Sequence, residues 1–269
     1  AAGDRSPSPS PPSAKWLLHA DLDPMRASET GKAVCHAIEA DHGANLRAFK
    51  RLSSLHLLHD IRDVTLYGDG RKDRAVVLFD GNFDRAHIED VVKAADDYSE
   101  STHAGFTIHS WKDKKKAQHA AFAAPDLLVF SPQDDLLKQA LDTLKANAPA
   151  APNPILPAAG SRPLVAIGAR LTDIEMPEDS ARVLRHIGLM KLDAREDGGR
   201  FAIRMNAETT DAIRANRLRR VLDGIIALAE VGNADLSSSG FQCDLAITDK
   251  PGVNMGMSLP VNEWLALLK

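Results

Sequence analysis

Alternation of polar and apolar residues in the second half of the chain predicts a β-hairpin. In RFAIRMNAE, residues 200–208, apolar side chains alternate with polar ones, and MKLDAR, residues 190–195, alternates in the same way. A period of two is typical of a strand with one buried face. Gly198 and Gly199 lie between the two segments and permit the positive φ values of a tight turn. The pattern therefore predicts an antiparallel pair of strands with one polar face.

A helix is expected directly after this hairpin. Apolar residues recur there at intervals of three and four, which is the spacing of a helix with one apolar face. The stripe consists of Leu218, Val221, Leu222, Ile225, Ile226 and Ala229. We expect this stripe to cover one face of the sheet.

The same order of elements occurs in both halves of the chain. The corresponding segments are 16–23 with 163–173, 63–81 with 189–207, 88–95 with 218–229, and 126–145 with 253–269. The shared ending is the most distinctive part, because in each half an apolar strand runs into Ser-Pro or Leu-Pro and a leucine-rich helix follows. The pattern predicts two tandem β-α-β-β-α-β-β-α units, with an extra short strand near residues 120–124 in the first.

Proline-rich segments mark the predicted boundaries. Residues 1–15 are rich in serine and proline, and proline supports neither helices nor sheet ladders, so we expect a disordered leader. Residues 148–162 have the same character and form the predicted linker. The first α+β unit then spans residues 16–147 and the second spans residues 163–269. The sequence leaves open whether the two units share one continuous sheet.

Each predicted unit resembles the ferredoxin-like βαββαβ arrangement, extended by a hairpin and a C-terminal helix. This resemblance rests on element order and implies antiparallel or mixed sheets with helices packed on one face. The tandem design with a hydrophilic leader is similar to uncharacterised exported bacterial proteins that carry domains of unknown function. That resemblance implies no activity.

The composition argues against a general affinity for polyanions. The net charge is −4 and the pI is near 6.2, which provides no attraction to nucleic acid phosphates. The basic run Lys112–Lys116 is expected at a solvated hairpin tip. The outer face of the second hairpin lacks the aromatic residues that stack on bases. No apolar run approaches the roughly 18 residues of a membrane-spanning helix, so we expect neither a nucleic-acid partner nor a membrane span.

The first residues suggest export. The chain begins at Ala1 with small residues followed by a Ser/Pro spacer, which fits either a protein after signal-peptide removal or a recombinant start. We expect a periplasmic or cell-envelope location, with the leader acting as a tether.

Motifs that identify common enzyme classes are missing from the sequence. It contains no GxGxxG, GxxxxGK[ST], HExxH or GxSxG. These motifs place backbone amides, imidazoles or a nucleophile at fixed offsets that their chemistry requires. We therefore predict no catalytic residue and no cofactor.

Histidine is unevenly distributed, since nine of the ten histidines lie in the first half. His56 and His59 are three residues apart and could share a helix face, and imidazole is a common ligand of zinc, copper and nickel. No carboxylate or third histidine lies at a ligand offset from them. The pair is the candidate metal site, but the interpretation that we favour is a chain without a bound metal.

A second histidine, His19, precedes two aspartates at alternating positions, Asp21 and Asp23. Enclosed in a pocket, the three would form a proton-transfer cluster. A helix N-cap at Asp23–Pro24 is the simpler interpretation.

Together these features favour a non-enzymatic exported protein that presents a polar sheet face or inter-unit groove to a protein, peptide or envelope component. One alternative is a hydrolase or metal-dependent enzyme with its site between the two units, using His19, Asp21 or the His56/His59 pair. Another is a periplasmic module that binds a small ligand in a deep apolar pocket. The identity of the ligand and the oligomeric state are not encoded in any recognisable motif.

Overall fold

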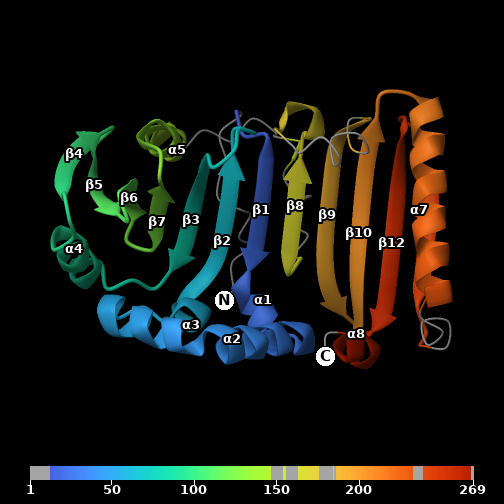
Figure 1. Ribbon diagram of the computed structural model, residues 1–269, viewed down its shortest axis with the longest axis horizontal. Coiled ribbons are helices and arrows are strands. Elements are labelled where there is room, and N and C mark those ends of the chain that lie inside the picture. The colour runs from blue at the N-terminus through green and yellow to red at the C-terminus, as the bar shows by residue number, and fades with distance from the viewer. Residues whose placement is uncertain are drawn as a thin grey trace.

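The computed structural model describes residues 13–146, 154–155, 163–175, 184, 186–232 and 239–267. Twelve strands in these residues form a single sheet (Figure 1). In chain order they are β1 (Trp16–Asp21), β2 (Ile61–Gly68), β3 (Ala75–Gly81), β4 (Ser99–His103), β5 (Phe106–Asp113), β6 (Lys116–Ala124), β7 (Leu127–Ser131), β8 (Val165–Ala169), β9 (Ile187–Asp197), β10 (Arg200–Thr209), β11 (Gln242–Ile247) and β12 (Gly252–Pro260).

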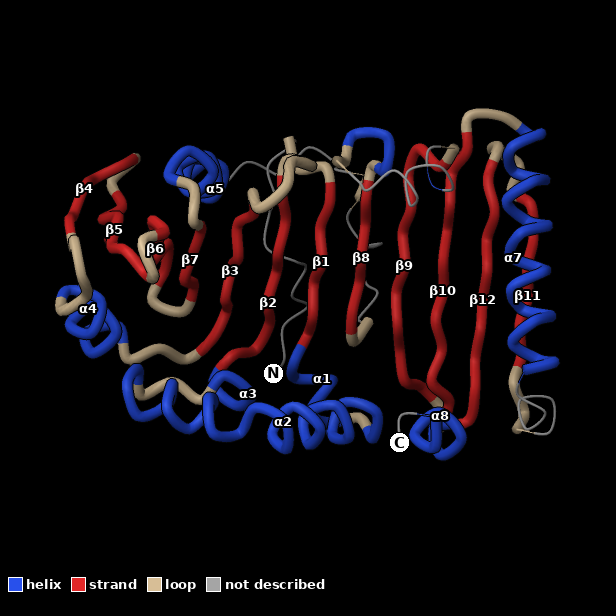
Figure 2. The backbone as a smooth tube through the Cα atoms, in the orientation of Figure 1, coloured by secondary structure: helices blue, strands red, loops and turns tan. Residues whose placement is uncertain are grey.

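The sheet is continuous from one end of the molecule to the other (Figure 2). Its order is β11-β12-β10-β9-β8-β1-β2-β3-β7-β6-β5-β4, and β11 and β4 are the edge strands. The central strands β1 and β8 pair with each other, with Trp16 opposite Ala169 and Ala20 opposite Val165. This pairing joins the strands before and after the proline-rich middle into one ladder.

The expectation of two tandem ferredoxin-like units is therefore wrong. In a ferredoxin-like unit, the two strands that a helix connects run parallel, with a third strand between them. Here β1 and β2, which the helical segment 22–60 connects, are direct antiparallel neighbours, and all twelve described strands belong to one sheet. Every pair of neighbouring strands in the described sheet is antiparallel. Element order along the chain does not determine strand order across a sheet. Pairing β1 with β8 also gives hydrogen-bond partners to backbone groups that two separate sheets would leave at open edges.

Helices pack on both faces of the sheet and along one end of its strands. They are α1 (Leu22–Ala27), α2 (Glu29–Ser53), α3 (Leu57–Asp60), α4 (Arg85–Lys93), α5 (Asp134–Ala146), α7 (Ala212–Gly232) and α8 (Val261–Leu267), with a 3-10 turn, η1, at Leu171–Asp173. The long α2 runs across the ends of the central strands (Figure 1). None of the described helices combines the length and hydropathy that crossing a membrane requires.

Two neighbouring residues of β1 show that the helices lie on opposite faces. Leu17 belongs to the core cluster that contains Leu137 and Leu141 of α5. Trp16 packs in a second cluster with Leu218 of α7. Because adjacent strand residues point to opposite sides of a sheet, α5 covers one face, here named the α5 face, and α7 covers the other, the α7 face. The expectation that helices would pack on one face only is wrong.

The hairpin predicted from the alternating pattern is confirmed. Strands β9 and β10 pair from Asp197 opposite Arg200 onward. Gly198 and Gly199 form the turn with φ values of 54° and 74°, which side chains other than glycine rarely adopt. The local pattern was sufficient here because the two strands are joined by only two residues.

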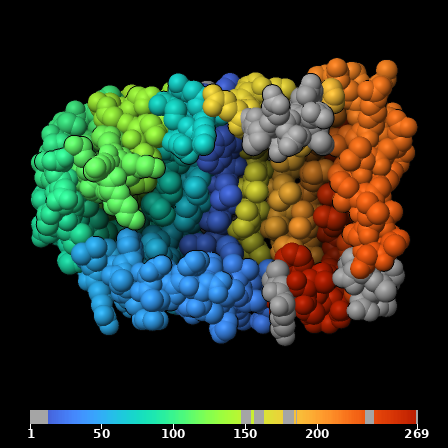
Figure 3. Space-filling view, in the orientation of Figure 1, coloured from blue at the N-terminus to red at the C-terminus, as the bar shows by residue number. Residues whose placement is uncertain are grey.

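The helical stripe on α7 covers the sheet only in part. Leu218, Leu222 and Ile226 are half-buried, whereas Val221 and Ile225 are 49% and 57% exposed. The helix lies at the end of the molecule, beside the edge strand β11 (Figures 1 and 2), so the sheet supports only one side of it. In the space-filling view, the strands beside α7 lie deeper than the helix (Figure 3).

Parts of the predicted leader and linker belong to the described fold. Ala14 is buried, and the backbone N–H of Lys15 donates to the carbonyl of Gly68 at 2.8 Å. Ile155, in the predicted linker, is 1% exposed and lies directly against Gly168 of β8. The first helix of the predicted second unit, expected between residues 173 and 189, falls mostly outside the described residues.

Candidate functional site

A concavity of about 490 Å³ lies on the α5 face of the second half of the sheet. Strands β8, β9, β10, β11 and β12 form its floor, and Ile155 lies at its border. The residues that line it, here named the sheet basin, are Ile155, Ala166, Ile167, Lys191, Leu192, Asp193, Arg204, Met205, Asn206, Asp244, Asn254, Met255 and Gly256.

Strand register brings the polar residues of the basin together in two rows. Arg204 lies opposite Asp193 on β9 and opposite Gly256 on β12. Asn206 lies opposite Lys191 and Asn254. Residues that are opposite one another, or two apart on one strand, share a face. The alternation that predicted the hairpin thus also places its polar residues on one surface.

The two basic residues of the basin have no acidic partner among the described residues. Asp193 is paired with Arg195, with 2.5 Å between Oδ1 and Nε, and no described carboxylate forms an ion pair with Lys191 or Arg204. The carboxylate of Asp244 lies over Gly256, where a larger residue would have its Cβ. The positive charges of Lys191 and Arg204 are therefore available to a ligand.

Two amide side chains complete the polar floor. Asn206 Nδ2 donates to Asn254 Oδ1 at 2.6 Å. Asn206 Oδ1 and Asn254 Nδ2 do not take part in this hydrogen bond. Guanidinium, ammonium and amide groups together suit carboxylate and phosphate oxygens. No histidine, cysteine or serine occurs among the described lining residues, so the basin offers no activated nucleophile of the usual kinds.

Two smaller cavities lie on the α7 face. One, of about 190 Å³, has almost entirely apolar walls and lies between β10, β12 and α8. The other, of about 230 Å³, lies beside α7 and includes Arg214 and Arg217. Both are smaller than the roughly 300–1,000 Å³ of typical small-molecule sites, whereas the sheet basin falls within that range.

The candidate metal residues His56 and His59 meet at α3. Their rings pack edge to face with centroids 4.1 Å apart. The structure adds Glu39 of α2, whose carboxylate the sequence did not associate with the pair. Burial, His59 and Lys50 lower the pKa of His56, which favours its neutral form. Glu39, His56 and His59 all lie within the first half of the chain, so they do not form a site between the two predicted units.

His19 and Asp21 have separate structural partners. His19 is 6% exposed, and its Nδ1 is 2.9 Å from Thr65 Oγ1. Burial lowers the pKa of His19. Asp21 is the N-cap of α1 and accepts the backbone N–H of Asp23. The predicted cap at Asp23–Pro24 is therefore wrong by two residues, because β1 ends earlier than expected and α1 begins at Leu22.

Other polar clusters also have structural partners. The Lys112–Lys116 run turns between β5 and β6, as predicted, with Lys114 and Lys115 at positive φ. His103 contacts Asp142, and His119 contacts Ser110, each at 2.8 Å and in a different place. These histidines do not converge with the α3 pair in any described ligand set.

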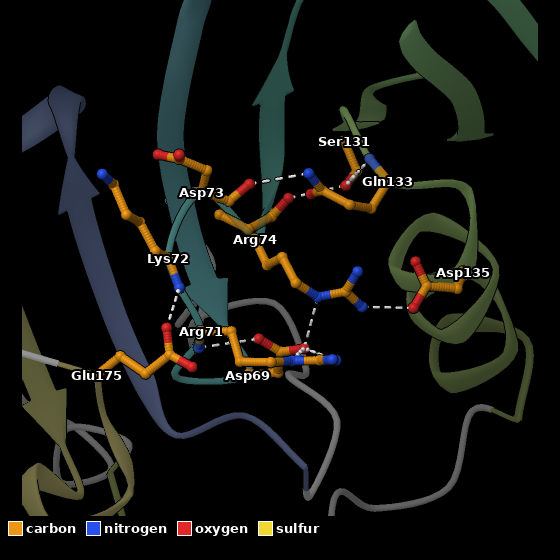
Figure 4. Close-up of polar contacts among 10 residues, drawn as sticks. Asp69, Arg71, Lys72, Asp73, Arg74, Ser131, Gln133, Asp135 and Glu175 are labelled. Atoms are coloured by element: carbon orange, nitrogen blue, oxygen red, sulfur yellow. Dashed lines mark hydrogen bonds and ion pairs between the residues drawn. The ribbon is translucent and has the colours of Figure 1, made fainter.

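The β2–β3 turn contains a dense network of charged groups (Figure 4). Asp69 accepts hydrogen bonds from Arg71 and Arg74, and Arg74 also contacts Asp135 at the start of α5. Burial alone would raise the pKa of Asp69, but the hydrogen bonds from both arginines outweigh it and lower the pKa to about 2. The backbone N–H of Lys72 donates to Glu175. Because Asp69, Arg71, Arg74 and Asp135 are all paired with one another, this part of the network fits a structural role.

Solved structures of similar fold include those of TP0453. Its crystal form III aligns with a TM-score of 0.53 and 10% identity, over 97% of this chain and 98% of that one. Crystal form IV aligns with a TM-score of 0.53 and 9% identity, over 97% of both chains. At this identity the likeness concerns the fold alone. No family model matches the sequence, and no curated protein matches it.

Proposed function

We propose that this chain is a non-catalytic binding protein whose sheet basin holds a ligand that carries a carboxylate or phosphate group. The observation that carries the proposal is the pair Lys191 and Arg204. Both are without an acidic partner among the described residues, and both lie in a concavity of about 490 Å³. Exposed basic residues usually point outward on a convex surface, where solvent screens them. Two of them in one concavity can act on the same bound group.

The size and the walls of the basin support binding of a small molecule or a short acidic peptide. Ile155 lies at the border of the basin and Ala166 shares the face of the charged groups, whereas Ile167, Leu192 and Met205 alternate with the charged residues and point their side chains to the α7 face. The side chains that face the basin are therefore mainly polar, which suits a ligand with acidic groups. The floor consists of paired strands, so the polar groups are held on a rigid element. A preformed site of this kind loses little conformational entropy when a ligand binds.

The proposed partner is therefore a peptide or envelope component with acidic groups, or a small organic acid. Export of the protein remains a prediction from the Ser/Pro-rich leader. The described lining residues include no serine, cysteine or histidine, so the proposal assigns the basin to binding and places no nucleophile there.

A titration followed by amide NMR spectra tests this proposal. The probes are inorganic phosphate, citrate and a hexaglutamate peptide, added separately to the uniformly ¹⁵N-labelled protein. We expect at least one probe to shift amide signals of β9, β10 and β12 in a saturable way. The Lys191→Gln/Arg204→Gln variant should lose this response.

The matched control is Arg220→Gln, which removes a positive charge from the exposed side of α7. It should bind as the unchanged protein does. Shifts that are scattered over the surface, or that are equal in the double variant and the unchanged protein, would show that the basin is not the binding site.

A second candidate function is binding of a small apolar ligand in the 190 Å³ cavity. Trp264 stacks on Phe201 there with ring centroids 4.2 Å apart, and its indole N–H is buried without an acceptor. An oxygen atom on a bound ligand would provide that acceptor. If 1-hexanol changes the tryptophan fluorescence of the unchanged protein but not that of Trp264→Phe, this cavity is occupied.

A further inference from the structure

Three side chains that commonly bind metals meet where α3 packs beside α2. Glu39 lies on α2, His56 precedes α3, and His59 lies within α3. Each offers one ligand atom, and these atoms all lie within 4.8 Å of one another. The α2 helix and the α3 segment thus bring two imidazole nitrogens and one carboxylate oxygen close together as possible metal ligands.

Local hydrogen bonds hold the two histidines in place. Asp60 Oδ2 accepts the backbone N–H of His56 at 2.6 Å, and the carbonyl of His56 accepts the N–H of His59 at 2.9 Å. Ser54 ends α2 with a φ of 57°, which turns the chain before His56. This turn allows the residues that follow α2 to lie near Glu39. The rings are therefore positioned by the backbone before any cation binds.

One nitrogen of this cluster lacks a hydrogen-bond partner. Nδ1 of His56 is buried, and it has no donor or acceptor within reach in the structure. A buried polar atom without a partner is destabilising, and native proteins contain few of them. Coordination of a cation by this nitrogen would remove the penalty.

We propose that Glu39, His56 and His59 bind Zn²⁺ or a similar divalent transition-metal ion. Two imidazoles and one carboxylate form a recurrent zinc ligand set that leaves the fourth position open. Calcium and magnesium prefer sites built from oxygen ligands, so they fit this set poorly. The site is distinct from the sheet basin, because the basin lies on strands of the other half of the chain.

Small side-chain rotations are sufficient to complete the geometry. Zinc–nitrogen and zinc–oxygen bonds of about 2.0–2.1 Å place tetrahedral ligand atoms about 3.3 Å apart. The three ligand atoms lie within 4.8 Å of one another, so they need to approach by about 1.5 Å at most. Glu39 and His59 are both exposed, which leaves their side chains room to rotate.

Calorimetric titration of the full chain with Zn²⁺ tests the proposal, together with Co²⁺ absorption as a probe of geometry. We expect one Zn²⁺ per chain, and visible Co²⁺ bands typical of a four-coordinate site. His59→Ala and Glu39→Gln should each weaken Zn²⁺ binding by at least about tenfold and reduce the Co²⁺ bands. Both positions are exposed, so both variants should fold, which circular dichroism would verify.

The control is His36→Ala, which removes an exposed histidine of α2 that lies outside the ligand set. It should bind Zn²⁺ as the unchanged protein does. Absence of stoichiometric binding would overturn the proposal, and so would binding that survives both ligand variants. An equal loss in His36→Ala would assign the binding to dispersed surface histidines and would also overturn it.

Discussion

Glu196 Oε2 accepts the backbone N–H of Thr30 at 2.8 Å, and its other carboxylate oxygen accepts the N–H of Glu29 at 2.9 Å. The end of β9 thus caps the first turn of α2, more than 160 residues earlier in the chain. A carboxylate at this position satisfies amide groups that have no partner within the helix and interacts favourably with the helix dipole.

We predict that Glu196→Ala lowers the free energy of unfolding by about 1–2 kcal/mol, since two amide hydrogen bonds and a favourable charge are lost. Urea denaturation at pH 7 would measure the change. Glu208→Ala, an exposed position on the paired strand, provides the control and should change stability by less than about 0.5 kcal/mol. Equal effects of the two substitutions would show that the cap contributes nothing specific.

The Asp69 network predicts a defined dependence of stability on pH. The folded-state pKa of Asp69 is about 2, below its ordinary value of 3.8, so the unfolded state binds the proton more readily. The stabilisation is therefore present above about pH 4 and is lost as the pH falls toward 2, with a total of about 2 kcal/mol. Asp69→Asn should be less stable than the unchanged protein at pH 6, and the difference should narrow at pH 2. A difference that is constant across this range would contradict the assignment.

Gly168 is expected to tolerate no side chain. The carbonyl of Ile155 occupies the place of a Cβ at this position, so Gly168→Ala should displace the Ile155 segment and cost about 1–3 kcal/mol. At Gly224 of α7, no atom lies within 4 Å of the place that a Cβ would occupy, and Gly224→Ala should raise stability by up to about 1 kcal/mol. Thermal unfolding of both variants would measure the contrast, and a Gly168→Ala protein of unchanged stability would show that the contact between Ile155 and Gly168 contributes little.

The two sides of α7 should differ in their sensitivity to truncation. Leu218 packs against the cluster of Ile187 and Ala207, so Leu218→Ala should cost about 1–3 kcal/mol. Leu228 is 73% exposed, and Leu228→Ala should cost less than about 0.5 kcal/mol. Chemical denaturation would compare them. A large cost at Leu228 would indicate that the exposed side of α7 is covered in solution.

Local features of this protein were readable from its sequence, whereas contacts between distant segments were not. The turn at Gly198 and Gly199 and the alternation on either side of it predicted the β9–β10 hairpin, because a two-residue connection leaves few alternative pairings. The partner of β1 was not predictable in this way. Its apolar pattern is compatible with several neighbours, and the choice of β8 depends on packing across the whole sheet.

The candidate sites show the same limit. The polar character of Lys191 and Arg204 follows from their place in the alternating pattern, but the concavity also depends on the position of Ile155 at its border. His56 and His59 were identified from their spacing. Glu39 was not, since its approach to them depends on the turn at Ser54, and nothing in the intervening sequence indicates how α2 and α3 pack.

The pairing of β1 with β8 has a consequence for synthesis of the protein. Strand β1 leaves the ribosome well before residues 165–169 are synthesised. The backbone N–H and C=O groups of β1 that pair with β8 in the complete protein have no partner strand during that time. Such an edge can recruit a strand from another chain. A fragment that stops before β8 should therefore self-associate or require a chaperone, and the two halves of the gene should not be expressible as separate, stable products.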